Sequence, residues 1–323
     1  MRAGSAQYHR TTGTDPGIPS ESLRSLTGGS VLRVPVSAHQ QGLSSTWQVW
    51  ELRRHAGKQL SLASFLMLLR YRQISRSKGS WVASMKASLF IPCLTDQFFP
   101  HVGISLWKIL RKAGAEVDYP MEQTCCGQPA FNSGYHMEAI ELARRFLNVF
   151  RNSEYIVSPS GSCTSMVKMF YPEILDGADV HELLHDVTAR TYEFSDFLVN
   201  VMGVKDLGAR FPYRVTYHDA CHLLRELKVK EAPRDLMRHV QGLELVEMEQ
   251  SESCCGFGGT FSVKFPDIST AMVEDKAAAI AKTGAEYVVA NDSSCLMQIG
   301  GYLSRRGAAV KPLHLADLLA QSL

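Results

Sequence analysis

The sequence contains no long hydrophobic run. A helix that crosses a membrane needs about 18 or more consecutive apolar residues, and the best candidate, residues 60–69, is too short and contains serine. The same segment lies too far from the N-terminus to be an ordinary secretory signal. The sequence therefore predicts no transmembrane segment, and its eight cysteines are expected in a reducing compartment, the cytoplasm.

Residues 1–84 have no cysteine and only 3 acidic residues against 11 lysines and arginines. This composition resembles an organellar leader. We favour the other interpretation, that translation begins at Met85, where a strand-like run starts, and we predict no fold for residues 1–84. Residues 85–323 carry 23 basic and 29 acidic residues, so nucleic acid is not an expected partner.

Cys-x-x-Cys is also absent, but the eight cysteines form two similar sets. In each set a Cys-Cys-Gly triplet follows a single cysteine after 31 or 32 residues and precedes another by 36 or 39. Glu154 and Glu286, each followed by tyrosine, both lie nine residues before the last cysteine of a set. The pattern predicts a duplication, with domains at 85–208 and 209–323. The two sets are Cys93, Cys125, Cys126 and Cys163, and Cys221, Cys254, Cys255 and Cys295.

Both copies alternate short β-branched or aromatic runs with helical periods, which indicates parallel βαβ units. The fold class is α/β, with two tandem repeated domains and mostly parallel sheets. The expected strands are 88–91, 116–119 and 155–157, then 214–217, 243–247 and 287–290. The expected helices are 102–112, 135–150 and 193–202, then 233–240, within 268–282 and from about 314, with a linker at 204–212.

The cysteines are predicted on loops at the carboxyl ends of strands. In parallel α/β sheets this edge is where ligands bind, so four thiols could converge in each half. Adjacent cysteines suit a cluster with several irons better than one tetrahedral zinc ion, whose ligands usually come in pairs two to four residues apart. The sequence favours an iron–sulfur cluster of the 4Fe-4S type, with zinc in one half as the alternative. Disulfides are less favoured because of the expected reducing compartment and the cysteine spacing. A dithiol–disulfide enzyme is less favoured because adjacent cysteines form only a strained ring.

Several motifs resemble the cysteine-rich CCG-domain iron–sulfur oxidoreductase family across residues 85–323. They include TCCGQPAFNSGY, SPSGSC, YHDACHLLREL and SCCGFGGTFSVK. The resemblance implies an iron–sulfur component of a multi-subunit system that oxidises L-lactate to pyruvate, with a ferredoxin-like iron–sulfur subunit and a third small subunit as partners. Glycolate or another small 2-hydroxy acid is an alternative substrate. A zinc-stabilised assembly subunit without a redox role is the alternative function.

The chain departs from the family pattern at one position in each copy. Full cluster-binding CCG domains end in Cys-x-x-Cys, whereas the earlier position of that pair is Ser160 in the first copy and Asp292 in the second. Ligation by five cysteines is therefore excluded, and four-thiolate ligation is not.

The residues around Cys221 form a polar stretch. His218, His222 and Arg225 could take a proton from a 2-hydroxy acid and hold its carboxylate. The interpretation we favour is that His222 caps or packs the loop and Arg225 is solvated, because the sequence shows no hydride acceptor.

Overall fold

The computed structural model describes residues 85–175, 180–321 and 323. Residues 1–84, interpreted above either as a leader or as sequence upstream of the true start, lie outside these residues. None of the helices in the described ranges has the length and hydropathy of a membrane-spanning segment.

The first half forms a four-stranded parallel sheet in the order β2-β1-β3-β4. Its strands are β1 (Lys86–Leu89), β2 (Glu116–Asp118), β3 (Tyr155–Ser158) and β4 (Thr191–Glu193). Its longer helices are α4 (Pro100–Lys112), α6 (His136–Phe150) and α9 (His181–Ala189). Its shorter helices are α3 (Cys93–Phe98), α5 (Gln128–Asn132), α7 (Gly161–Ser165), η1 (Met166–Phe170), α8 (Tyr171–Ile174), α10 (Phe194–Asp196) and η2 (Phe197–Val201), of which η1 and η2 are π-helical.

The second half repeats this plan, in the order β6-β5-β7-β8 and again with parallel pairs only. Its strands are β5 (Arg214–Tyr217), β6 (Glu244–Leu245), β7 (Tyr287–Ala290) and β8 (Lys311–His314). Its helices are α11 (Cys221–Arg225), α12 (Glu231–Arg238), α13 (Phe261–Lys264), α14 (Pro266–Lys282), α15 (Ser293–Arg305) and α16 (Leu315–Ala320). The predicted α/β class and the duplication are confirmed.

The sequence analysis missed one strand in each half. β4 and β8 lie at the sheet edges, where each pairs with a single neighbour. β4 has three residues, and β8 contains Pro312, which cannot donate a ladder hydrogen bond. Such short edge strands give almost no periodic signal. The helices predicted from 193 and about 314 begin directly after them.

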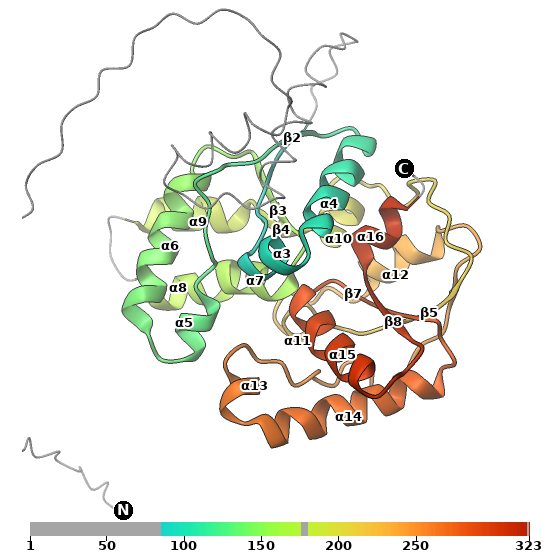
Figure 1. Cartoon of the computed structure of the whole chain (residues 1–323). Helices are drawn as coiled ribbons and strands as arrows, with labels where there is room; N and C mark the ends of the chain where they lie inside the picture. The colour runs from blue at the N-terminus through green and yellow to red at the C-terminus, as the bar shows by residue number, and fades with distance from the viewer. Residues whose placement is uncertain (1–84, 176–179, 322) are drawn as a thin grey trace, which may run out of the picture. The chain divides into compact units, whose positions relative to one another are not determined.

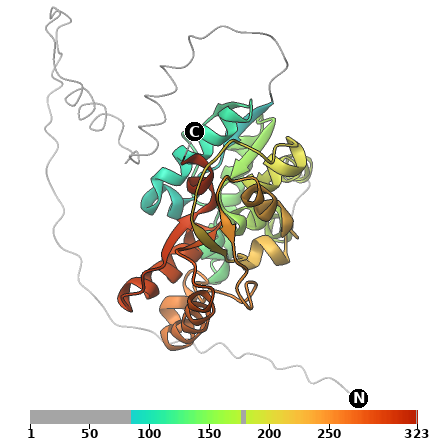
Figure 2. The ribbon, with the colours of Figure 1, turned by 90° about the vertical axis from the view of Figure 1, so that its right-hand side faces the viewer.

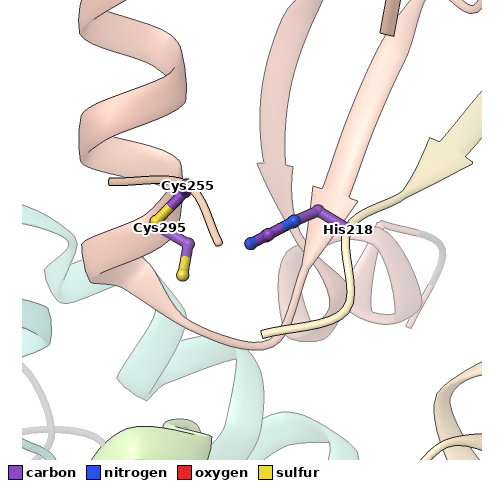
Figure 3. Close-up of side chains that lie close together, drawn as sticks. All are labelled: His218, Cys255 and Cys295. Atoms are coloured by element: carbon purple, nitrogen blue, oxygen red, sulfur yellow. The ribbon is translucent and has the colours of Figure 1, made fainter. Parts of the chain in front are cut away.

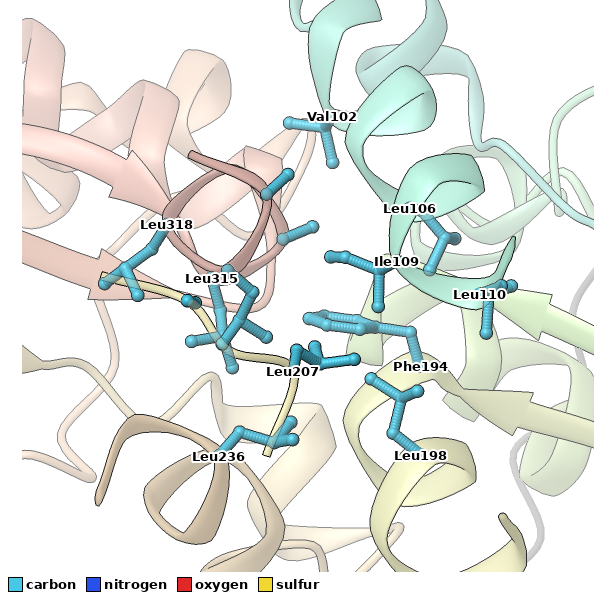
Figure 4. Packing of buried hydrophobic residues seen from close by; sticks show 14 of the residues in the cluster. Val102, Leu106, Ile109, Leu110, Phe194, Leu198, Leu207, Leu236, Leu315 and Leu318 are labelled. Atoms are coloured by element: carbon cyan, nitrogen blue, oxygen red, sulfur yellow. The ribbon is translucent and has the colours of Figure 1, made fainter. Parts of the chain in front are cut away.

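A hydrophobic core shared by the two halves lies among α4, α10, η2, α12 and α16. α4 begins with proline at its first position and is followed by Gly114 at φ 98°. Residues next to the helix therefore determine where it begins and where it ends. Figure 4 shows Ile109 and Leu110 of α4 in one cluster with Leu315 of α16. α16 thus lies beside α4 of the other half, as Figures 1 and 2 both show.

The predicted linker contributes to this core as well. Leu207, Ala209 and Phe211 are buried in it, and Arg210 forms an isolated bridge with Gln241. The segment between the two sheets is therefore packed against both of them.

A buried carboxyl group also joins the halves. Glu193, at the end of β4, accepts hydrogen bonds from the backbone N–H groups of Ser195 and Asp196 and from the side-chain amide of Asn291, which follows β7. Burial raises the pKa of Glu193 to about 8, against the effect of these donors. Asn291 Oδ1 has no partner, and it would accept a hydrogen bond from the protonated carboxyl group after rotation of the amide.

We expect Glu193 to make the free energy of unfolding depend on pH. The unfolded carboxyl group ionises near pH 4.5, whereas the folded one keeps its proton up to about pH 8. Stability is therefore fully present below pH 4.5 and falls as the pH rises towards 8. In the Glu193→Gln variant the side chain stays neutral, so its free energy of unfolding does not show this decrease with pH. In urea denaturation, the stability of wild type relative to Glu193→Gln should drop by a few kcal/mol between pH 5 and pH 8.

The exposed Glu249 serves as the control. Glu249→Gln should follow the wild-type curve at every pH. Parallel curves for wild type and Glu193→Gln would mean that Glu193 is ionised in the folded chain.

Candidate metal centre

All eight cysteines follow the carboxyl end of a strand, as predicted, but only half of them lie on loops. The two Cys-Cys pairs lie in the loops that lead from β2 to α5 and from β6 to α13. The single cysteines lie instead in the first turns of short or long helices: Cys93 in α3, Cys163 in α7, Cys221 in α11 and Cys295 in α15. Each half thus places four thiols at one edge of its sheet.

The two sets meet. A single cavity of about 190 Å³ is lined by residues of both halves, among them all eight cysteines. The sequence predicted one set per half but did not predict that the two edges face each other. The structure therefore brings every predicted cysteine to one place.

The first set is held close enough for its thiols to share protons. Cys93 Sγ lies 3.5 Å from Cys125 Sγ, and Gly127 N–H donates to Cys125 Sγ at 3.4 Å. Hydrogen bonds from the Cys126 and Cys93 thiols lower the pKa of Cys125 to about 3. The same contacts, together with burial, raise the pKa values of Cys93 and Cys126.

The second set repeats this arrangement. Gly256 N–H donates to Cys254 Sγ at 3.4 Å. Hydrogen bonds from the Cys221 and Cys255 thiols lower the pKa of Cys254 to about 2, and Cys255 likewise lowers the pKa of Cys295 to about 7 despite burial. In each half a thiolate is stabilised by neighbouring S–H donors, whose protons a bound metal would displace.

The glycine of each Cys-Cys-Gly triplet is required by the backbone. Gly127 and Gly256 have φ values of 87° and 84°, in the left-handed region. A Cβ atom on Gly256 would lie 2.7 Å from the carbonyl oxygen of Ser269 in α14. The triplet therefore turns its N–H towards sulfur while its backbone contacts the following helix.

The two positions that lack the family's additional cysteine bond to each other. Ser160 Oγ donates to Asp292 Oδ2 at 3.2 Å, and Ser162 N–H donates to the same oxygen at 2.9 Å. Asp292 Oδ1 accepts from the hydroxyl of Ser294 at 2.6 Å. Ser160 and Asp292 are buried, so these positions connect the halves beside the cavity.

The three residues considered for proton transfer and carboxylate binding, His218, His222 and Arg225, lie in different surroundings in the structure. His222 lines the cavity, and its Nδ1 lies 2.7 Å from Glu226 Oε2. Arg225 is not among the lining residues and donates to the carbonyl oxygen of Glu252 at 3.2 Å. His218 is buried close to Cys255 and Cys295, and neither of its ring nitrogens forms a hydrogen bond of acceptable geometry.

The sequence analysis missed the charged groups beneath the second set. Arg234 donates to both oxygens of Asp219, each at 2.8 Å, and to Glu247 at 2.7 Å. Burial alone would raise the pKa of Asp219, but the bonds from Arg234 hold it below its usual value. Asp219 is thus paired with Arg234, and the neighbouring charge of His218 also lowers its pKa. Its position next to His218 in the sequence was the only signal that could have marked it.

The model of the CCG cysteine-rich domain matches the chain twice, at residues 87–168 and 215–300. A lactate utilization protein A from Oceanobacillus iheyensis is 49% identical over 236 residues, which cover 73% of this chain and 96% of that protein. A lactate utilization protein A 2 from Bacillus cereus is 46% identical over 240 residues, 74% of this chain and 99% of that protein. The chain belongs to the lactate utilization protein A group of CCG proteins.

The aligned residues are nearly the whole of both relatives. Among solved structures, a hypothetical protein from Helicobacter pylori aligns with a TM-score of 0.49 at 10% identity, over 85% of this chain and 56% of that chain. A likeness at this level carries no argument about function.

Replacement of the triplet glycine should destabilise the second set. Gly256→Ala adds a close contact to an unfavourable φ, and we expect it to lower the free energy of unfolding by about 2–4 kcal/mol. Gly259→Ala is the matched control, since Gly259 has φ 63° but open space around it, and should cost about 1–2 kcal/mol. Urea denaturation under anaerobic conditions measures both, and equal losses would contradict the role given to the Ser269 contact.

Proposed function

We propose that this chain is the iron–sulfur electron-transfer component of a multi-protein cytoplasmic system that oxidises L-lactate to pyruvate. The observation that carries the proposal is the meeting of two four-thiol sets at one cavity. The name of the relatives, lactate utilization protein A, supports the choice of substrate. The proposed partners are a ferredoxin-like iron–sulfur subunit and a third small subunit.

The donor sets fit thiolate-ligated clusters. Cysteine sulfur is the usual ligand of iron–sulfur clusters, and four cysteines per half match the ligand number of a 4Fe-4S cluster. Gly127 and Gly256 already direct N–H groups at sulfur, at 3.4 Å in both halves, and such contacts raise the reduction potential of a cluster. A bound cluster would supply reversible electron storage within each set.

The chain's own residues have simpler tasks in this proposal. The eight cysteines hold the centres, and the buried side chains around them limit the access of water, which lowers the local dielectric constant. Oxidation of L-lactate to pyruvate releases two electrons and two protons. We assign this two-electron oxidation, with release of both protons, to a partner, and the two halves would carry the electrons onward.

Metal analysis tests the ligand sets. After anaerobic purification we expect about four iron and four sulfide per half, with broad absorption near 400 nm. Cys125→Ser and Cys254→Ser should each remove the iron and sulfide of one half, because a hydroxyl group replaces a ligand. Ser253→Ala, next to Cys254, is the control and should keep both. Zinc alone in both halves would favour the non-redox assembly function instead.

Growth tests the substrate. Cells that lack the gene should fail to grow on L-lactate and should recover with the wild-type gene or Ser253→Ala, but not with Cys254→Ser. Growth on glucose should be unaffected in all strains. If the deletion instead blocks growth on glycolate and leaves growth on L-lactate intact, the system oxidises a different 2-hydroxy acid.

A further inference from the structure

His218 has no partner that explains its burial. It lies between β5 and Cys221, its exposed fraction is 0%, and neither ring nitrogen forms a hydrogen bond of normal geometry, although the ring interacts with the Cys295 thiol. Buried polar groups in folded proteins are almost always hydrogen-bonded or coordinated to a metal. The ring interacts with the Cys295 thiol, so a metal held by that thiol would also satisfy the imidazole.

The ring is directed at two thiols. A nitrogen of His218 and the sulfur atoms of Cys255 and Cys295 all lie within 4.8 Å of one another, and Figure 3 shows the imidazole pointing towards both cysteines. Nitrogen and sulfur ligands of one tetrahedral ion lie roughly 3.5–4 Å apart, given metal–ligand distances of about 2.0–2.3 Å. Only a small inward movement would place all three donors on a common metal.

The first half has no such donor. Both first cysteines lie four residues after a strand, β1 or β5, and the two strands have equivalent registers, Ala87 with Tyr155 and Val215 with Tyr287. Phe90 is therefore the counterpart of His218. It is buried in an aromatic cluster, 4.9 Å from Phe146 between ring centroids.

A second pair of equivalent positions also differs between the halves, with an aromatic residue in the first half and a nitrogen-bearing side chain in the second. Gly127 contacts Ala139 in α6 as Gly256 contacts Ser269 in α14, so Phe146 and Lys276, seven residues later, are counterparts. Lys276 is buried and donates to the carbonyl oxygens of Gln250 at 2.7 Å and Ser251 at 3.1 Å, in the loop before Cys254. The second half thus has an imidazole and an ammonium group where the first half has two phenyl rings.

We propose that His218 is a nitrogen ligand of the metal centre in the second half. With Cys255 and Cys295 it forms a mixed nitrogen–sulfur site in which the imidazole takes the place of one of the four thiolates, whereas the first half binds through sulfur alone. Imidazole is a common ligand of both zinc and iron, including iron in clusters, so the assignment holds for either metal. It rests on the proposed presence of a metal in the second half.

X-ray absorption at the edge of the bound metal tests the assignment. The measurement uses the full chain carrying Cys125→Ser, which removes the first-half centre from the signal. We expect a nitrogen scatterer together with sulfur. Adding His218→Phe, which copies the first half, should abolish that nitrogen signal and weaken metal retention against a chelator at least about tenfold. Adding His222→Phe, which removes an imidazole held by Glu226, should change neither.

His218→Cys keeps the test decisive if the phenylalanine variant fails to fold. It should retain the metal with sulfur scatterers only. A sulfur-only centre before substitution, or an unchanged nitrogen signal in both His218 variants, would overturn the assignment while leaving the proposed function intact. A second half without any metal would overturn both, and metal analysis of the same sample separates these outcomes.

Discussion

The direction of the parallel strands is the constraint on which the site depends. Every strand of a parallel sheet ends at the same edge, and in both halves the thiols follow those ends. The bond from Ser160 to Asp292 and the contact from Asn291 to Glu193 then join the two edges. Eight thiols spread over some two hundred residues are collected at one cavity because the carboxyl edges of the two sheets meet there.

The duplication preserved the backbone and changed the environment of the thiols. Strand order, register and the left-handed glycine are the same in both halves. The differences lie in the side chains around the thiols: the first half has Phe90 and Phe146 where the second half has His218 and Lys276. Aromatic packing gives the first set an apolar surrounding, whereas a buried ammonium group near the second set favours negative charge on its sulfurs. Two centres with different electronic properties are thus expected from one ancestral arrangement.

Much of the fold could be predicted because its signals are local. Strands 214–217 and 287–290 were predicted at their observed bounds, and the placement of cysteines after strands followed from them. β4 and β8 were missed because short edge strands lack periodicity. The common cavity depends on the packing of α16 against α4, and the approach of His218 to Cys255 and Cys295 depends on loops far apart in sequence. No local pattern records such distances, so only the three-dimensional structure could reveal them.

Apolar packing within each half holds the thiols in position. Cys126 packs into one apolar cluster with Phe90 and Phe146, and Cys255 and Cys295 pack into another beneath α14 and α15. Small structural zinc domains fold only when the ion binds, but here each set is fixed by its own core and by the shared core behind it. A metal bound there would displace the shared protons of thiols that the surrounding cores already hold in place.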